Sequence, residues 1–279
     1  MNNLNTSFRM VRVLGLLMLT LCTLQLDSYA QKISTSPTRI NFKVAPGASG
    51  RGKMTVTNNS NARQRFQVTF GDFKANPVGR GEFLDKGEVD RSCAEWLSAS
   101  PAVFEIDPGE KQDVTVLLDA PADSSAMVAR WAVAYVRLAP REIEGKEGEG
   151  LIVRVNQSYR FAVYMFQTPP NALAAKGEIL GLDYENDVFT VEIKNVGETF
   201  LRCNSYVEFT SLSTGQTQRV ATKGFTILPT GHRYKSFDVP KDLPPGRYSV
   251  LAVLDYGNRD EVEAAEMEIM VPEKGNDDN

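Results

Sequence analysis

The sequence is poor in the residues from which most catalytic and metal centres are built. Its 279 residues contain one histidine, His232, and three cysteines. One imidazole is too little for a zinc site of cysteine and histidine ligands or for a centre with histidine as general base. The sequence also has no nucleophile-elbow, phosphate-loop or zinc-protease motif. We therefore expect a protein that is not an enzyme and needs no metal or cofactor.

An excess of positive charge is also absent. Lysine and arginine number 31 against 35 aspartate and glutamate residues, for a formal net charge of -4. The chain thus has no general attraction for phosphate backbones, and nucleic acid is not an expected partner. Residues 31–169 contain 18 basic and 16 acidic side chains, whereas residues 170–279 contain 11 and 18. The acidic second part is therefore less suited to holding an anion.

No apolar run is long enough to span a bilayer as a helix, which takes roughly 20 residues. The longest run, residues 13–26, follows basic Arg9 and Arg12 and precedes Ser28-Tyr29-Ala30, the small-x-small pattern of a cleavage site. We predict a signal peptide over residues 1–30 and an exported, soluble mature chain without a membrane span. An uncleaved anchor is the alternative, which the short run disfavours.

The three cysteines allow few arrangements. Cys22 lies within the predicted signal peptide, and Leu21 before it argues against lipidation, which requires a small residue there. Signal removal leaves Cys93 and Cys203 in an oxidising compartment. Two alternatives remain for them: a disulfide that joins the two halves of the chain, or two partly buried thiols. The sequence favours the thiols, because the two residues are far apart and are expected in different domains.

Apolar residues recur at every second position through most of the chain, which is typical of half-buried strands. In the first half they form the runs Met54-x-Val56, Phe66-x-Val68-x-Phe70, Val114-x-Val116-x-Leu118 and Trp131-x-Val133-x-Tyr135. In the second half they form Phe189-x-Val191-x-Ile193, Val207-x-Phe209, Tyr248-x-Val250-x-Ala252-x-Leu254 and Met267-x-Ile269-x-Val271. Proline, glycine and asparagine turns separate the runs. The pattern predicts an all-β fold of two tandem immunoglobulin-like β-sandwich domains.

We place the domain boundary at Pro169-Pro170, since two residues without a backbone donor stiffen the join. The predicted domains are residues 31–168 and 169–272, and a polar tail follows over residues 273–279.

Residues 151–166 predict an unusually long strand with one apolar face, because they include no glycine or proline. Leu151, Val153 and Val155 begin this face. A strand of this length exceeds what a sandwich edge normally pairs, so part of it is expected to lack a partner within its own chain. Such an edge can pair with a foreign chain by strand addition. The alternative is a last strand that only completes the sheet of the first domain.

Three segments resemble the PapD-like periplasmic pilus chaperones. They are Ile33-Ser-Thr-Ser-Pro-Thr-Arg-Ile-Asn-Phe42, then Ser100-Pro-x-x-Phe-x-Ile-x-Pro-Gly-Glu110, and the long strand itself. The resemblance covers the first mature domain and implies two immunoglobulin-like domains that act as a chaperone in the periplasm. It also implies secreted or pilus-like protein subunits as partners, together with an outer-membrane assembly protein. A larger polar insert over residues 71–92 departs from the family pattern.

In that family, one basic residue on the first strand and another on the last strand of the first domain bind the terminal carboxylate of a client. By resemblance these are Arg39 and Arg160, since Arg160 follows Val155 by five positions. Two guanidinium groups can hold a carboxylate with charge-assisted hydrogen bonds. Leu151, Val153 and Val155 correspond to the residues that the chaperone donates to its client. The alternative for both arginines is a solvated surface charge.

A second hypothesis is a structural or adhesive envelope protein, attached to the outer membrane or the cell surface, that binds a wall polymer or another envelope protein. Its sugar-stacking residues would be Trp96, Trp131 and Tyr135, although their alternation favours core packing. The acidic positions Asp183 and Asp187 lack the glycine turn and ligand spacing of a calcium loop, so we read them as a solvated turn.

Overall fold

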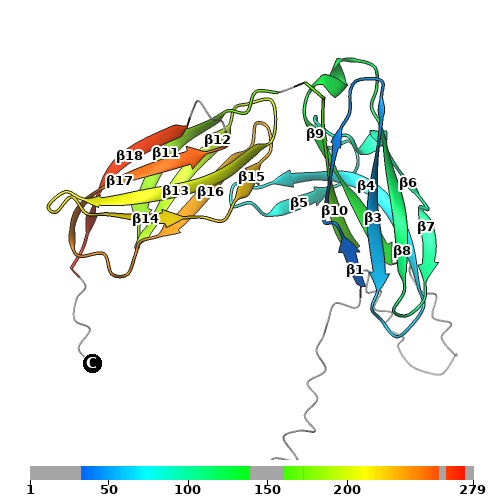
Figure 1. Ribbon diagram of the computed structural model, residues 1–279, viewed down its shortest axis with the longest axis horizontal. Helices are drawn as coiled ribbons and strands as arrows, with labels where there is room; N and C mark the ends of the chain where they lie inside the picture. The colour runs from blue at the N-terminus through cyan, green and yellow to red at the C-terminus, as the bar shows by residue number, and fades with distance from the viewer. Residues whose placement is uncertain (1–32, 139–159, 172, 258–261, 274–279) are drawn as a thin grey trace, which may run out of the picture.

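The computed structural model describes residues 33–138, 160–171, 173–257 and 262–273. The predicted signal peptide, the predicted donor residues Leu151, Val153 and Val155, and the tail from residue 274 lie outside the described residues. The described part is all-β, as predicted, with eighteen strands and two short 3-10 helices, η1 (Ala94–Trp96) and η2 (Ser124–Met127). The strands form two sandwiches that meet at an angle (Figure 1). Within this described part, no helix is long and apolar enough to cross a membrane.

The first sandwich consists of two sheets. One has the order β1-β3-β8-β6, from β1 (Ile33–Ser36), β3 (Ser49–Asn58), β8 (Lys111–Asp119) and β6 (Leu97–Ser100). The other has the order β2-β10-β9-β4-β5, from β2 (Arg39–Lys43), β10 (Arg160–Thr168), β9 (Arg130–Leu138), β4 (Gln64–Ala75) and β5 (Gly81–Leu84), and β7 (Val103–Ile106) also pairs with β4. The second sheet contains both predicted arginines.

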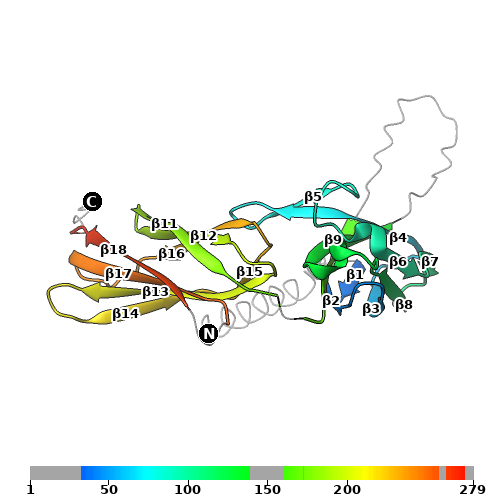
Figure 2. The same ribbon diagram turned by 90° about the horizontal axis from the view of Figure 1, so that it is seen from above.

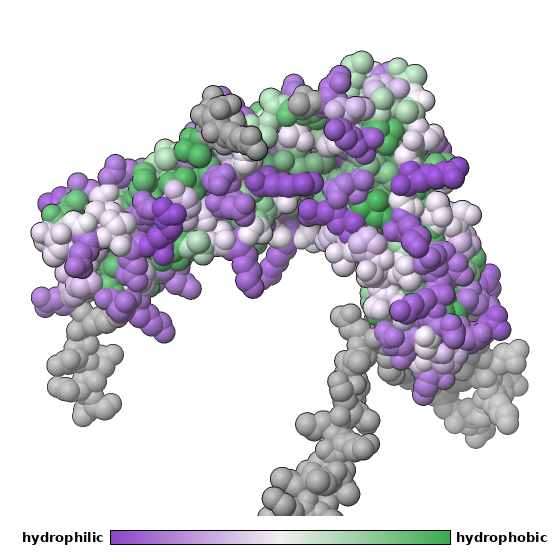
Figure 3. Space-filling model, viewed as in Figure 1, coloured by the Kyte–Doolittle hydropathy of each residue, from purple (hydrophilic) through white to green (hydrophobic). Residues whose placement is uncertain are grey.

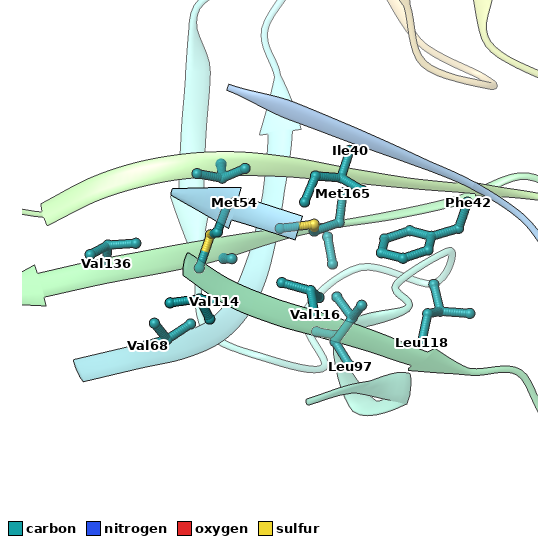
Figure 4. Close-up of a cluster of buried hydrophobic side chains, with 14 of the residues drawn as sticks. Ile40, Phe42, Met54, Val68, Leu97, Val114, Val116, Leu118, Val136 and Met165 are labelled. Carbon is teal, nitrogen blue, oxygen red and sulfur yellow. The ribbon is translucent and has the colours of Figure 1, made fainter. Parts of the chain in front are cut away.

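The core of the first sandwich follows the predicted alternation. Met54 and Val56 of β3 and Val114 and Val116 of β8 are fully buried between the two sheets. Figure 4 shows Met54, Val114 and Val116 in the same cluster as Met165 of β10 in the second sheet. Because β10 contributes to this core, its backbone is held firmly in place beside β9.

The second sandwich follows the same plan with its own core. Its sheets have the orders β11-β12-β16 and β14-β13-β17-β18, and β15 also pairs with β13. Their bounds are β11 (Gly177–Glu185), β12 (Val188–Asn195), β13 (Leu201–Ser211), β14 (Thr217–Ala221), β15 (Phe225–Ile227), β16 (His232–Asp238), β17 (Gly246–Asp255) and β18 (Glu263–Val271). Phe189, Ile193, Val207 and Phe209 lie fully buried at the centre.

A buried asparagine ends one strand in each sandwich. Asn58, at the end of β3, donates its side-chain N–H groups to the carbonyl oxygens of Ala62 and Ile106, both at 2.9 Å. Asn195, at the end of β12, donates in the same way to Thr199 and Ile227 at 2.8 and 3.0 Å. Both side chains are completely buried. Each amide therefore satisfies one buried backbone carbonyl and one partly buried one.

In the described residues, Cys93 and Cys203 are free thiols, so the disulfide alternative is wrong. Cys93 packs in the core of the first sandwich and Cys203 in the core of the second, which keeps their sulfur atoms in separate cores. Burial raises the pKa of both thiols, to about 12 for Cys203. Both cysteines therefore act as small core residues.

The sandwiches contact each other along two routes. At the connection that contains Pro169-Pro170, the Phe166 ring of the first sandwich packs edge-on against Phe200 of the second, with ring centres 4.8 Å apart. Farther away, the β4–β5 hairpin extends from the first sandwich to β16 (Figure 2). There the backbone N–H of Tyr234 donates to the carbonyl oxygen of Pro77 at 2.7 Å. The insert over residues 71–92 thus bridges the sandwiches.

Candidate protein-binding edge and face

Strand β10 lies between β9 and β2, but the two neighbours cover different lengths of it. Pairing with β9 runs antiparallel from Arg160 to Gln167, whereas pairing with β2 runs parallel and begins only at Tyr164. The backbone N–H of Tyr164 donates to the carbonyl oxygen of Thr38 at 2.9 Å, at the start of this contact. Within the described ranges, residues 160–163 therefore have a paired strand on one side only.

The path of the first strands explains this open edge. Strand β1 pairs with β3 in the opposite sheet, and the chain then crosses to join β10 as β2. The crossing leaves the segment before Tyr164 uncovered. Backbone groups alternate in direction along a strand, so those of Arg160 and Ala162 point to the same side as the N–H of Tyr164. These groups form the open edge.

Side chains of β10 also alternate between two faces. Val163 and Met165 are fully buried in the core of the first sandwich, and Phe161 packs against it. This agrees with the apolar face predicted for the odd positions. Arg160 and Tyr164 lie on the opposite face. Leu151, Val153 and Val155 belong to the undescribed part of the predicted strand, and their role stays a prediction.

The opposite face of the sheet places the predicted arginines on adjacent strands. Arg39 of β2 lies directly beside Tyr164 of β10, and Arg160 lies directly beside Arg137 of β9. Tyr164 follows Arg160 by four residues, so the Cα atoms of the two predicted arginines are separated by about 13 Å along the strand. The arginines share a face, but the register does not make them neighbours.

Arg39 lies next to the contact between the sandwiches. Its guanidinium carbon is 4.7 Å from the ring centre of Phe166. Partial burial lowers the pKa of Arg39, and so does the positive charge of Arg202 in β13 of the second sandwich. Arg202 in turn donates to the side-chain oxygen of Asn41 at 3.4 Å, two residues after Arg39 on β2. Arg39 is therefore held between the β10 face and the second sandwich.

Arg160 lies over aromatic rings at the other end of the face. Its guanidinium carbon is 4.3 Å from the ring centre of Tyr135 and 5.3 Å from that of Phe83. The Tyr135 hydroxyl donates to the carbonyl oxygen of Asp72 at 3.2 Å, and burial raises the pKa of Tyr135. Within the described parts of the chain, neither Arg160 nor Arg39 forms an ion pair with a carboxylate.

The aromatic residues considered for sugar stacking are packed against protein. Trp131 and Tyr135 are 6% and 2% exposed, and both belong to the cluster between the β10 face and the second sandwich. Trp131 donates its indole N–H to the carbonyl oxygen of Phe73 at 3.0 Å. Trp96 packs partly buried against the first core, with Arg130 over its ring. None of these three rings presents an open face for a sugar.

A cavity of about 500 Å³ separates the β4–β5 hairpin from the second sandwich, lined by Lys74, Trp131, Leu228 and His232 among others. The Nδ1 atom of His232 is 3.5 Å from a carboxylate oxygen of Glu192. Asp187 lies exposed at the turn from β11 to β12, whereas Asp183 lies exposed within β11 and pairs with Thr190, so the predicted turn does not include it. In the described residues, no three histidine, cysteine, aspartate or glutamate side chains gather in a way that could hold a metal ion.

Comparisons with known proteins give distant structural likenesses. No known protein-family profile matches the chain, and no curated protein sequence matches it. Among solved structures, the chain is similar to a chain from a chaperone–tip adhesin complex of CFA/I fimbriae, at 14% identity and a TM-score of 0.46, over 86% of this chain and 99% of that chain. It is similar to the CupB2 chaperone of Pseudomonas aeruginosa at 16% identity and a TM-score of 0.42, over 85% of this chain and 100% of that chain.

A third similar structure is the CsuC–CsuE chaperone–tip subunit complex of Csu pili from Acinetobacter baumannii, at 12% identity and a TM-score of 0.43, over 84% of this chain and 97% of that chain. Two of these structures are chaperone–subunit complexes of fimbriae or pili, and the third is a chaperone. Likenesses at these identities and TM-scores carry no information about what this chain binds.

Proposed function

We propose that this protein is an exported, periplasmic chaperone or assembly factor that binds a secreted or pilus-like protein subunit by β-strand addition. The observation that carries the proposal is the open edge of β10 over residues 160–163, which β9 holds in place from the other side. An outer-membrane assembly protein that receives the subunit is the proposed second partner. This role involves no catalysis, cofactor, metal or nucleic acid.

The open edge supplies what strand addition needs. The backbone groups of Arg160 and Ala162 can accept and donate the hydrogen bonds of a further strand, which provide affinity. Leu151, Val153 and Val155 stand before this segment at alternate positions, and we propose that they fill pockets in the client. An open apolar edge promotes uncontrolled pairing in most proteins, so its presence here is best explained by a partner that covers it.

The positive charges of Arg160 and Arg39 favour a client that carries negative charge near the edge. Both lie on the face beside the edge, and in the described chain neither has a carboxylate partner. We propose that they attract and bind the end of the client that bears its C-terminal carboxylate. Charge-assisted hydrogen bonds from arginine to a carboxylate are about twice as strong as neutral ones, which suits an anchoring role.

The test is purification of the exported protein with the secreted partner that accompanies it. Ala162→Pro removes an N–H from the open edge while leaving the bonds to β9 in place. We expect this variant, Arg39→Ala and Arg160→Ala to lose the same partner at unchanged melting temperature. Arg51→Ala, an exposed arginine of β3 in the opposite sheet, is the matched control and should retain it.

Two results would count against the proposal. A partner that stays bound to Ala162→Pro excludes strand addition at this edge, and the structural or adhesive hypothesis would then replace it. A large fall in melting temperature for Arg39→Ala or Arg160→Ala marks that arginine as a structural residue rather than a binding one.

A further inference from the structure

The cavity of about 500 Å³ beside the β4–β5 hairpin has walls from both sandwiches. Residues 74–76, residues 88–91 and Trp131 come from the first sandwich, and residues 226–233 come from the second. The described residues of β2 and β10 contribute nothing to this lining, so the cavity is separate from the open edge. Its volume falls within the roughly 300–1,000 Å³ of pockets that bind small molecules.

Arg233, on the wall from the second sandwich, is a partly buried cation without a counter-ion. Within the described chain no carboxylate forms an ion pair with it, and its buried Nε atom has no hydrogen-bond acceptor. Burial alone lowers the pKa of Arg233, with no contribution from a neighbouring charge. A desolvated guanidinium that lacks an acceptor is unfavourable, and an anion in the cavity would supply the acceptor.

The guanidinium group of Arg233 is held in place by its neighbours. It lies over the ring of Phe225, with its central carbon 5.8 Å from the ring centre. It also packs against Gly79 at the tip of the hairpin, where an added Cβ atom would lie 1.2 Å from one of its nitrogen atoms. Because the group is positioned before a ligand binds, an anion can be bound at a low cost in conformational entropy.

The turn that leads into β16 is strained on the same wall. Thr230 has a φ angle of +65°, which is unusual for a β-branched residue. Its backbone N–H donates to the carbonyl oxygen of Asn195 at 3.1 Å, and the N–H of Gly231 donates to that of Leu228 at 2.9 Å. These bonds hold the exposed Thr230 in the lining of the cavity. Backbone strain of this kind is common at ligand-binding sites.

The other charged side chains of the lining are of both signs. Lys74 and Arg91 are basic, whereas Glu88 and Asp90 are acidic. Arg91 already donates to the carbonyl oxygen of Glu198 at 3.2 Å. The two carboxylates would repel a ligand with several negative charges, and the three lysine and arginine side chains of the lining would repel an ammonium group. Hydroxyl groups can donate to the carboxylates without either penalty.

We propose that this cavity binds a small organic anion that carries one acidic group and several hydroxyl groups, such as a sugar acid or a sugar phosphate. Arg233 donates to the carboxylate or phosphate group, and Glu88 and Asp90 accept hydrogen bonds from the hydroxyl groups. The charge-assisted bonds from the guanidinium provide most of the affinity. The ligand contacts both sandwiches and therefore stabilises the angle between them. This site does not depend on strand addition at β10.

The experiment measures binding to the full mature chain by calorimetry. Four compounds are compared: glucuronate, glucose 6-phosphate, glucose and inorganic phosphate. The first two supply both an acidic group and hydroxyl groups, whereas each of the other two supplies only one kind. We expect glucuronate or glucose 6-phosphate to bind at least about tenfold more tightly than glucose and inorganic phosphate. The tighter of the two shows whether the site prefers a carboxylate or a phosphate.

The variants separate the roles of the charged residues. Arg233→Gln should weaken binding of the preferred anion at least about tenfold and leave binding of glucose unchanged. Glu88→Ala combined with Asp90→Ala should reduce the preference for that anion over inorganic phosphate. Lys235→Gln is the matched control, because Lys235 lies 5.6 Å from the centre of the same Phe225 ring but does not line the cavity. It should bind as the wild-type chain does.

Melting temperatures with and without the preferred anion complete the test. The anion should raise the melting temperature of the wild-type chain and of Lys235→Gln, but not that of Arg233→Gln. A wild-type chain that binds none of the four compounds overturns the inference, and so does an equal loss of binding in Lys235→Gln. Inorganic phosphate bound as tightly as the sugar anions overturns the role of the hydroxyl groups. If Arg233→Gln melts at a lower temperature but binds normally, Arg233 only supports the hairpin.

Discussion

The backbone N–H of Tyr234 in the second sandwich donates to the carbonyl oxygen of Pro77 in the first, at 2.7 Å. Pro77 lies at the tip of the β4–β5 hairpin, and Tyr234 belongs to β16, an edge strand of its sheet. The hairpin therefore covers part of an edge that would otherwise be open. Figure 3 shows the bent molecule as a filled surface, with hydrophobic residues among hydrophilic ones where the two sandwiches meet.

A substitution at Gly79 tests whether this hairpin fixes the angle between the two sandwiches. Its φ angle is +82°, and a Cβ atom there would lie 1.2 Å from a guanidinium nitrogen of Arg233. Gly79→Ala should displace Arg233 and loosen the hairpin. Small-angle X-ray scattering should then report a larger radius of gyration.

Gly87 provides a matched control for this change. Its φ is +94°, but a Cβ atom there would meet nothing within 4 Å. Both alanine variants should lose about 1–2 kcal/mol of stability from the left-handed backbone. Only Gly79→Ala should change the scattering curve, and equal curves for the two variants would show that the hairpin does not set the angle between the sandwiches.

Asn58→Ala and Asn195→Ala should each destabilise their own sandwich. Each substitution removes two hydrogen bonds to backbone carbonyls, one buried and one partly buried, and we expect a loss of about 2–3 kcal/mol in the free energy of unfolding. Urea denaturation followed by fluorescence measures the loss. Asn61→Ala, at an exposed position of the turn after β3, should change stability by less than about 0.5 kcal/mol. A loss as large in Asn61→Ala would mean that turn propensity, and not the buried amide, is responsible.

Amide hydrogen exchange should alternate along the start of β10. The N–H groups of Phe161 and Val163 point to β9 and should exchange slowly, whereas those of Arg160 and Ala162 point to the open edge and should exchange quickly. Binding of a partner by strand addition should slow exchange at Ala162. Uniformly slow exchange in the isolated chain would show that its own residues already cover the edge.

The thiols give the chain a pH dependence at the alkaline end. Burial raises the pKa of Cys93 and Cys203 in the folded state, to about 12 for Cys203. Above the ordinary thiol pKa of about 8.5, the unfolded chain releases these protons before the folded chain does, so stability falls as pH rises toward 12. Urea midpoints from pH 8 to 10.5 should show this fall. Serine at both positions should reduce the slope, and an unchanged slope would assign it to other groups.

Much of the core of the first sandwich could be predicted, because alternation of apolar residues is a pattern within each strand. Alternation in β3 and β8 placed Met54, Val56, Val114 and Val116 inside, and the structure buries all four. Strand β9 follows a different rule, since residues 131–136 are buried on both faces. Alternation assigns Trp131, Val133 and Tyr135 to the sandwich core, but the second sandwich and the β4–β5 hairpin cover these residues, and the alanines between them face the core instead. This covering depends on contacts distant in sequence.

The candidate site could also be predicted only in part. The sequence indicated Arg39 and Arg160 by their places in two strands, and the structure puts both on one face. It could not indicate that Arg137 lies opposite Arg160, because the register between β9 and β10 decides which side chains are neighbours. Stacking on Tyr135 was equally hidden, since the pattern presented that ring as ordinary core.

Two separate attachments, one at Phe166 and Phe200 and the other at Pro77 and Tyr234, remove the freedom of a simple hinge. We expect a molecule braced in this way to behave as a rigid bracket, whose inner surface changes little in shape when a partner binds. Under the proposed function, the client chain would then supply most of the adjustment on binding, and this protein would lose little conformational entropy. We therefore expect such a bracket to bind incompletely folded clients in preference to fully folded ones.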